Sequence, residues 1–250
     1  MVSFQELRVR IIDFFRITKN ETKAFLIASA VAALVFSFCD WGPANQCSGE
    51  FSLWLGLVHL LIVFSIVFVS LLFRVSCQKI YALNQGYTAH FRPWWNGMVL
   101  SLVIGVISMG KGAVLLPGRI HAEVLGKQRL GESSPSFSYL DNAQIALWGI
   151  ISHFLLALFF AIGSFAWPDT YFFVKGFALN MIIGFFSLLP LPQLEGLQLF
   201  FGSRPIYYTT IISFIVLGAL LLIPSKISLV ITIIITTSAG LLALLLRSEK

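Results

Sequence analysis

Long apolar stretches recur along the whole sequence, and they constrain the fold more than any other feature. Six uncharged runs approach or reach the length that crosses the hydrocarbon core of a bilayer. They are residues 24–39, 51–73, 142–168, 176–194, 205–225 and 227–246. With 58% hydrophobic and only 11% charged residues among 250, an ordinary water-soluble fold is excluded. We therefore expect an all-α polytopic membrane protein, with about six transmembrane helices in a single membrane domain over residues 1–250.

The distribution of basic residues predicts the orientation of these spans. Five Lys and Arg residues lie between residues 8 and 23, whereas the loop at residues 40–50 contains none. Cytoplasmic segments carry the excess of basic residues, so the N-terminus is expected in the cytoplasm, and six crossings return the C-terminus to the same side. Topology thereby accounts for the net charge of +6, and no nucleic-acid partner is expected.

The three cysteines are divided between the two sides of the membrane in this topology. Cys39 and Cys47 fall together on the outer side, where a disulfide is chemically permitted, and two free thiols are the alternative. Cys77 falls on the other side and cannot pair with them.

The segment at residues 79–141 does not resemble a membrane helix. Residues 87–94 and 112–124 are short mixed segments bounded by Gly and Pro, which predicts strands. The apolar run at residues 95–110 is short and contains two glycines, which is typical of a re-entrant or interfacial hairpin. We expect this strand and re-entrant region on the cytoplasmic side, buried in protein or beside a wet cavity.

An acidic residue follows a rigid corner at the end of the fourth run. Residues 187–196 read Ser-Leu-Leu-Pro-Leu-Pro-Gln-Leu-Glu-Gly, and the two prolines end a helix and hold an extended segment. Glu195 therefore comes directly after a non-helical turn close to a membrane span. An ionisable residue at such a place is a candidate functional site.

This segment resembles the NLLPxPPLDG motif of the site-2 proteases, a family of intramembrane zinc metalloproteases. Asn180 lies seven residues before Ser187, as a family asparagine does before the asparagine of NLLP. Residues 146–157, including Gly149 and His153, are similar to the AGPxxNxxLA segment of the family. Three further likenesses are to archaeal-type members: Lys79, Ala82 and Gly86; the run Phe91-Arg92-Pro93-Trp94; and Gly112 to Gly118, which is similar to their PGAV hairpin.

The resemblance implies that the catalytic motif is degenerate. The spacing places the HExxH of the family on Arg74-Val75-Ser76-Cys77-Gln78. In working members the two histidines and an aspartate bind zinc, and the glutamate activates water. Arg74 and Gln78 replace the histidines here, Val75 replaces the glutamate, and Glu195 replaces the aspartate. A cation repels zinc, an amide is a poor zinc ligand and valine accepts no proton, so no catalytic residue and no cofactor are expected.

Because Arg74 and Glu195 occupy positions that converge on one ion in the family, we expect them to form a buried salt bridge. Gln78, one helical turn from Arg74, would add a hydrogen bond. In the alternative, Arg74 extends to the cytoplasmic interface and Glu195 is solvated.

The other histidines provide a weaker alternative. His153 replaces a family asparagine near the catalytic centre, but His153 and Glu195 give two ligands where catalytic zinc needs three from the protein. His59 is expected to be a hydrogen-bonded interior residue, and His90 and His121 are expected at surfaces or interfaces.

These residues are consistent with three alternative functions. The first is an inactive site-2 protease relative, a pseudoprotease, that binds other membrane proteins along an edge strand; the family implies Tyr87, His90, Phe91 and Trp94 for that strand. The second is an active protease with rearranged ligands. The third is a small transporter, for which the spans offer few polar residues. The family also implies a prokaryotic plasma membrane, where the partners are lipid and transmembrane proteins.

Overall fold

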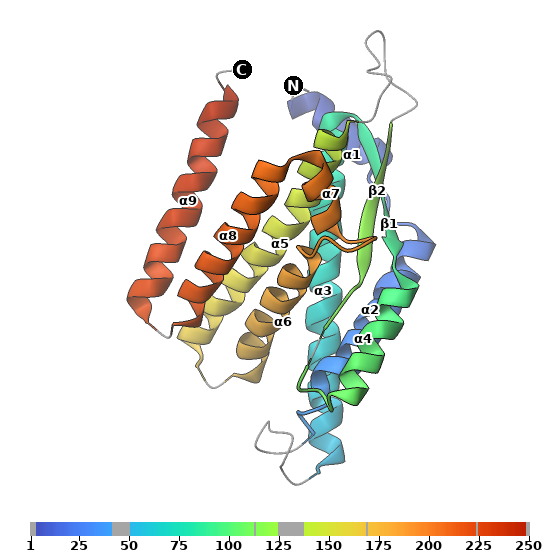
Figure 1. The fold of residues 1–250 in the computed structure, drawn as a ribbon, viewed down its shortest axis with the longest axis vertical. Helices are drawn as coiled ribbons and strands as arrows, with labels where there is room; N and C mark the ends of the chain where they lie inside the picture. Colours follow the sequence, from blue (N-terminus) through green and yellow to red (C-terminus); the bar gives the residue numbers. More distant parts are fainter. Residues whose placement is uncertain are drawn as a thin grey trace.

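A computed structural model describes residues 4–41, 51–112, 114–124, 138–168, 170–223 and 225–248. Its nine helices are α1 (Phe4–Phe14), α2 (Lys19–Ser37), α3 (Leu53–Gln85), α4 (Trp95–Ile107), α5 (Tyr139–Ala166), α6 (Tyr171–Ser187), α7 (Glu195–Gly202), α8 (Arg204–Leu222) and α9 (Lys226–Ser248). The two strands are β1 (Tyr87–Pro93) and β2 (Gly118–Val124). The described chain is therefore mostly helical, with one small sheet (Figure 1).

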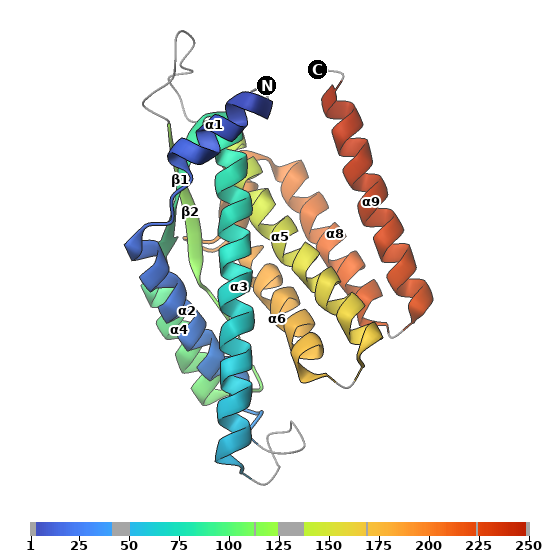
Figure 2. The same cartoon turned by 180° about the vertical axis from the view of Figure 1, so that it is seen from behind.

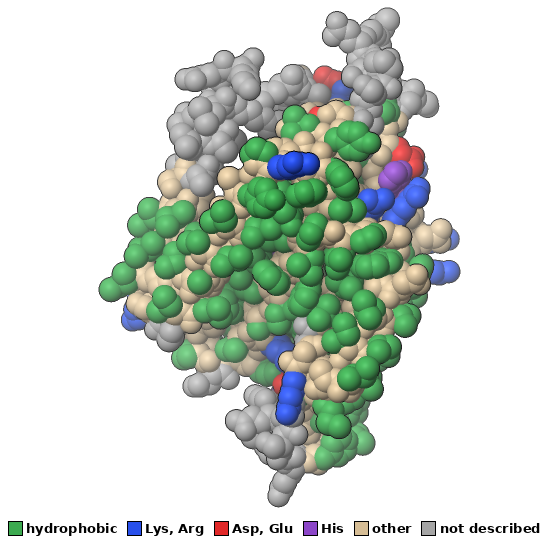
Figure 3. All heavy atoms as spheres, in the orientation of Figure 1, with side chains coloured by type: hydrophobic (Ala, Val, Ile, Leu, Met, Phe, Trp, Pro, Cys, Tyr) green, Lys and Arg blue, Asp and Glu red, His purple; other side chains and the backbone are tan. Residues whose placement is uncertain are grey.

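Among the described residues, four helices are long and apolar enough to cross a membrane, namely α2, α3, α5 and α8. The other two expected spans correspond to α6, an apolar helix of 17 residues, and to α9, of which the described stretch Lys226–Ser238 is apolar. Length and hydropathy in the described chain thus support four of the six spans. Figure 3 shows the matching surface, with hydrophobic side chains over the middle of the face and most basic side chains toward its ends and edges.

Helix α3 is longer than its apolar run and continues beyond Phe73, where that run ends. The helix continues through Arg74, Gln78 and Lys79 to Gln85, and its 33 residues extend about 50 Å. It continues because the polar side chains that end the hydropathy signal are buried against partners in the folded chain. Gly86, with φ of 88°, then ends it in the left-handed conformation that favours glycine.

Most of the apolar run at residues 95–110 forms a single helix, α4, rather than the two arms of the expected hairpin. Glycine suggested a break in this run, but Gly105 instead permits close helix packing. A Cβ atom there would lie 2.9 Å from Cγ1 of Val35 on α2. Helix α4 therefore lies beside α2 (Figures 1 and 2).

The two predicted strands are present and form an antiparallel pair. His90 lies opposite His121, and Pro93 lies opposite Gly118. Buried and more exposed side chains alternate along β1, and the buried ones, which include Phe91, pack on α2 and α3. Phe91 and Phe25 of α2 have ring centroids 5.0 Å apart. The sheet thus packs on both α2 and α3, which also pack against each other (Figures 1 and 2).

Helices α5 to α9 lie on the other side of α3 (Figure 2). Helix α5 packs against α3, α6, α7 and α8, so it is the central helix of this half. Helix α1 and the end of α9 lie at the same end of the molecule. That end also carries α7 and the corner before it, which brings Glu195 to α3.

Candidate functional site

Arg74 and Gln78 lie on one face of α3 because they are four residues apart, about one helical turn. Both side chains are 0% exposed, and Arg74 is among the largest fully buried side chains of the described chain. A guanidinium in such surroundings needs a partner, since an unpaired buried charge is strongly destabilising.

The partner comes from the corner between α6 and α7. Pro190 and Pro192 keep the chain out of helix after Ser187, and Gln193 has a φ of 64°, which turns the backbone sharply. Leu194 anchors the turn in the core, and Glu195 then begins α7. The sequence thus builds a rigid corner that directs one carboxylate into the protein.

Arg74, Gln78 and Glu195 meet on a single carboxylate oxygen. Arg74 donates to Oε1 of Glu195 from Nη2 at 2.7 Å and from Nε at 2.9 Å, and Gln78 Nε2 donates to the same oxygen at 2.5 Å. The ion pair and the hydrogen bond expected from the sequence are both present. Glu195 is also 0% exposed, which excludes the alternative of a solvated carboxylate.

Two backbone carbonyls complete this cluster. Arg74 Nη2 also donates to the carbonyl of Gly118 at 2.9 Å, and Gln78 Nε2 donates to the carbonyl of Ile145 at 3.3 Å. Gly118 begins β2, and Ile145 belongs to α5. Side chains and backbone from α3, β2, α5 and α7 therefore meet around one carboxylate.

Gly149 lets α5 approach the cluster. A Cβ atom at this position would lie 2.3 Å from Gln78 Nε2 and 2.4 Å from Glu195 Oε1, closer than Cβ atoms come to such neighbours. The absence of a side chain at Gly149 is thus part of the site.

Gly149→Ala is expected to lower the free energy of unfolding by about 1–3 kcal/mol, because the added methyl overpacks a buried ion pair that cannot move aside. Gly112→Ala is the matched control, since its Cβ atom would meet nothing nearer than 3.3 Å. Thermal unfolding of both variants in the same detergent tests the difference. Equal melting temperatures for the two variants would show that α5 does not lie in close contact with the Glu195 carboxylate at Gly149.

His153, Asn180 and Ser187 are all buried, and none of them forms a hydrogen bond with Glu195 in the part of the chain that the structure describes. His153 Nδ1 lies 3.2 Å from Asn180 Oδ1. Because that oxygen only accepts, Nδ1 carries the proton. Asn180 Nδ2 donates in turn to the carbonyl of Gly176 at 2.9 Å. Val75, at the position of the family glutamate, lies in the hydrophobic core with 1% exposure.

The residues of the site do not fit a zinc ion. Two donors of Arg74 and one of Gln78 are directed at Oε1 of Glu195, and the guanidinium places a fixed positive charge beside the carboxylate. No group of three His, Cys, Asp or Glu side chains able to hold a metal occurs among the described residues. His153 and Glu195, the weaker alternative, would remain two ligands.

The four residues that the family resemblance implies for an edge strand that binds other proteins lie on or beside β1. Tyr87 is buried, and its hydroxyl donates to Asp141 Oδ2 at 2.7 Å. Burial and this carboxylate raise the pKa of Tyr87 to about 12. His90 is exposed, Phe91 is buried, and Trp94 precedes α4. The site thus offers both apolar and polar side chains along one strand.

Sequence reasoning missed a second buried ion pair beside β1. Glu21 Oε2 of α2 accepts from Lys79 Nζ of α3 at 2.8 Å, and the two side chains are 3% and 4% exposed. One local signal was available, because Thr18 and Glu21 have the spacing of a capping box, which the structure forms. The pairing with Lys79 was not accessible, since it joins positions 58 residues apart.

A third polar cluster lies near the opposite end of α3. Asp40 Oδ2 accepts from Lys175 Nζ at 2.5 Å and from the hydroxyl of Tyr171 at 2.6 Å. His59 Nδ1 lies 2.7 Å from the carbonyl of Asp40, which confirms that His59 is a hydrogen-bonded interior residue. The predicted pairing of Cys39 with Cys47 involves a residue outside the described part of the chain.

The fold and the site define a mostly helical protein with four helices able to cross a membrane and a buried cluster of Arg, Gln and Glu. The chain is similar to a protein of Methanocaldococcus jannaschii named "Putative zinc metalloprotease MJ0611". They are 25% identical over 193 residues, which cover 74% of this chain and 85% of the relative. No family model and no solved structure matches the sequence. The similarity points to the metalloproteases without distinguishing among their families.

Proposed function

We propose that this chain is a catalytically inactive relative of the site-2 proteases that binds segments of other membrane proteins. One observation carries the proposal. The segments that resemble the four family motifs meet at the Glu195 carboxylate, through Arg74 and Gln78, the Gly118 carbonyl, Gly149 and Glu195 itself. The resemblance implies that these segments meet at one site, and segments without that relationship would not be expected to meet around one carboxylate.

The chemistry of these residues supports an inactive site. The guanidinium of Arg74 acts only as a donor, and Nε2 of Gln78 donates to Glu195 and to the carbonyl of Ile145. Val75 has no group that accepts a proton from water. Glu195, held by three donors on one oxygen, serves as the counter-ion of Arg74 rather than as a metal ligand. The cluster therefore takes over the cross-linking role of an ion and joins α3, β2, α5 and α7.

Strand β1 is the proposed binding surface. It pairs with β2 on one side, so its other edge offers backbone groups with which an extended segment can form hydrogen bonds. A transmembrane segment that unwinds locally would supply such a strand. In this proposal both chain ends face the cytoplasm of a prokaryotic cell.

Elemental analysis of the purified protein tests the proposal. We expect substoichiometric zinc that does not change when Glu195 is replaced by alanine. Stoichiometric zinc that is lost in Glu195→Ala, together with chelator-sensitive cleavage of a membrane substrate, would instead establish an active protease with rearranged ligands.

A further inference from the structure

The outer edge of β1 is already in contact with another part of the same chain. The backbone amide of Phe91 donates to Oε1 of Glu21 at 2.8 Å. It therefore points away from β2. In an antiparallel pair the backbone groups of alternate residues point to opposite sides, so Ala89 faces the same outer edge as Phe91. Trp94 supports this alternation, because it lies three residues after Phe91 and its amide points to the opposite side, where it donates to the carbonyl of Pro117 at 3.2 Å.

Glu21 holds this position through several bonds at once. Its Oε2 accepts from Lys79 Nζ and from the Thr18 amide, each at 2.8 Å. Lys79 Nζ also donates to the carbonyl of Arg16 at 2.8 Å. One lysine of α3 therefore fastens both the connection between α1 and α2 and the carboxylate that bonds β1. We call residues 16–21 the N-terminal latch.

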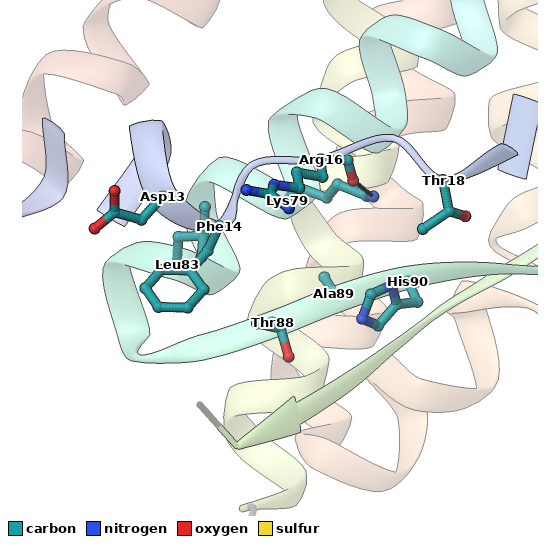
Figure 4. A pocket seen from close by; sticks show the side chains of 9 residues that line it. All are labelled: Asp13, Phe14, Arg16, Thr18, Lys79, Leu83, Thr88, Ala89 and His90. Carbon is teal, nitrogen blue, oxygen red and sulfur yellow. Dashed lines mark hydrogen bonds between the residues drawn. The ribbon is translucent and has the colours of Figure 1, made fainter. Parts of the chain in front are cut away.

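Two cavities adjoin the latch and share Thr18 and His90 in their walls. On one side a cavity of 440 Å³ lies between the α1–α2 connection and β1, with Thr18, Lys79 and His90 in its wall (Figure 4). On the other side a cavity of 550 Å³ is also bounded by Thr18 and His90, and by Glu21. In Figure 4 the connection runs along β1, and a dashed line joins Arg16 to Lys79. The latch lies where the two cavities meet.

We propose that the N-terminal latch closes the edge of β1 and must release before an extended segment can pair with this strand. The inference rests on the proposed client binding and adds its regulation. A client carbonyl and the Glu21 carboxylate compete for the one hydrogen of the Phe91 amide, so the two states exclude each other. The direct contact with the strand is one hydrogen bond from a side chain rather than a strand pair.

Hydrogen exchange at the Phe91 amide tests the latch in the full-length protein in detergent. Glu21→Ala removes the acceptor and is expected to speed exchange at Phe91 by about tenfold or more, as local opening becomes easier. Thr18→Ala is the matched control, because it weakens the cap of α2 but leaves the Glu21 contacts to Phe91 and Lys79 in place. Its exchange at Phe91 is expected to stay within about twofold of wild type.

Glu21→Gln keeps the test decisive if the alanine variant folds poorly. Glutamine preserves the capping box and an acceptor for Phe91 but loses the charge that pairs with Lys79, so an intermediate increase in exchange is expected. Unchanged exchange at Phe91 in both Glu21 variants would overturn the latch. An equal increase in Thr18→Ala would overturn it too, since helix capping would then explain the protection.

Binding of a fluorescent peptide of ten alternating Val and Thr residues separates the latch from the proposed function. If both hold, Glu21→Ala binds this peptide about tenfold more tightly than wild type or Thr18→Ala does. Faster exchange without peptide binding in any variant would support the latch and contradict client binding at β1. Equal, tight binding to wild type and Glu21→Ala would contradict the latch and leave the proposed function standing.

Discussion

Arg74→Ala is expected to lower the free energy of unfolding by about 3–5 kcal/mol, because it leaves the Glu195 carboxylate buried without its counter-ion. Both side chains are 0% exposed, so water cannot replace the lost partner without rearrangement of the core. The loss extends beyond the ion pair, since the Gly118 carbonyl also loses its donor. Glu195→Ala should be similarly costly, because the guanidinium is then unpaired.

A double-mutant cycle isolates the interaction. We expect Arg74→Ala with Glu195→Ala to cost clearly less than the sum of the single changes, with a coupling of about 1–3 kcal/mol. Reversible unfolding in mixed micelles, or melting temperatures where unfolding is irreversible, provides the measurement. Arg92→Ala is the control, because its side chain is 62% exposed and 3.8 Å from Glu123, and such surface pairs contribute about 0–1 kcal/mol. Additive single effects would show that Arg74 and Glu195 are not coupled.

The helices and strands were predictable where one local pattern decides them. Strands were predicted within residues 87–94 and 112–124 from the Gly and Pro that bound these segments, and they form at residues 87–93 and 118–124, so the second begins six residues later than predicted. Hydropathy failed along α3, since it treats Arg74 and Lys79 as the end of a span. It cannot register that Glu195 and Glu21 neutralise these cations from distant parts of the chain.

The side chains of the site were predictable, but their surroundings were not. The family resemblance predicted that Arg74, Gln78 and Glu195 lie together, because the positions that they occupy converge on one ion in that family. The roles of the Gly118 and Ile145 carbonyls could not be predicted, because every residue has a carbonyl and only the fold determines which two of them accept these hydrogen bonds. The same limit applies to the partners of Glu21.

Two buried ion pairs join the sheet to α3 at different positions along that helix. Arg74 and Lys79 lie on α3, one joined to the corner before α7 and the other to the start of α2. The Arg74 pair also bonds Gly118 at the start of β2, and the Lys79 pair also bonds Phe91 of β1. The sheet is therefore held to α3 at two points. In the proposed release of the N-terminal latch, the Arg74 pair still holds the start of β2 to α3.

Arg74→His with Gln78→His is expected to create a zinc site in this chain. Both positions already face Glu195, with Nη2 of Arg74 at 2.7 Å and Nε2 of Gln78 at 2.5 Å from its Oε1. Histidines four residues apart on a helix, together with this carboxylate, form the His₂Glu ligand set of known zinc enzymes. The double variant removes the guanidinium and should bind about one zinc per chain, whereas wild type should bind none stoichiometrically.

Val75 is left unchanged in this design, because a binding site needs no general base and Val75 is buried in the core. The matched control adds Glu195→Ala to the two histidines, which removes the third ligand and should abolish stoichiometric zinc. Zinc should also raise the melting temperature of the double variant alone, because a metal that binds only the folded state stabilises it. A double variant that folds but takes up no zinc would mean that these positions do not retain the geometry of a metal site. The proposed descent from an intramembrane metalloprotease would then lose its main support.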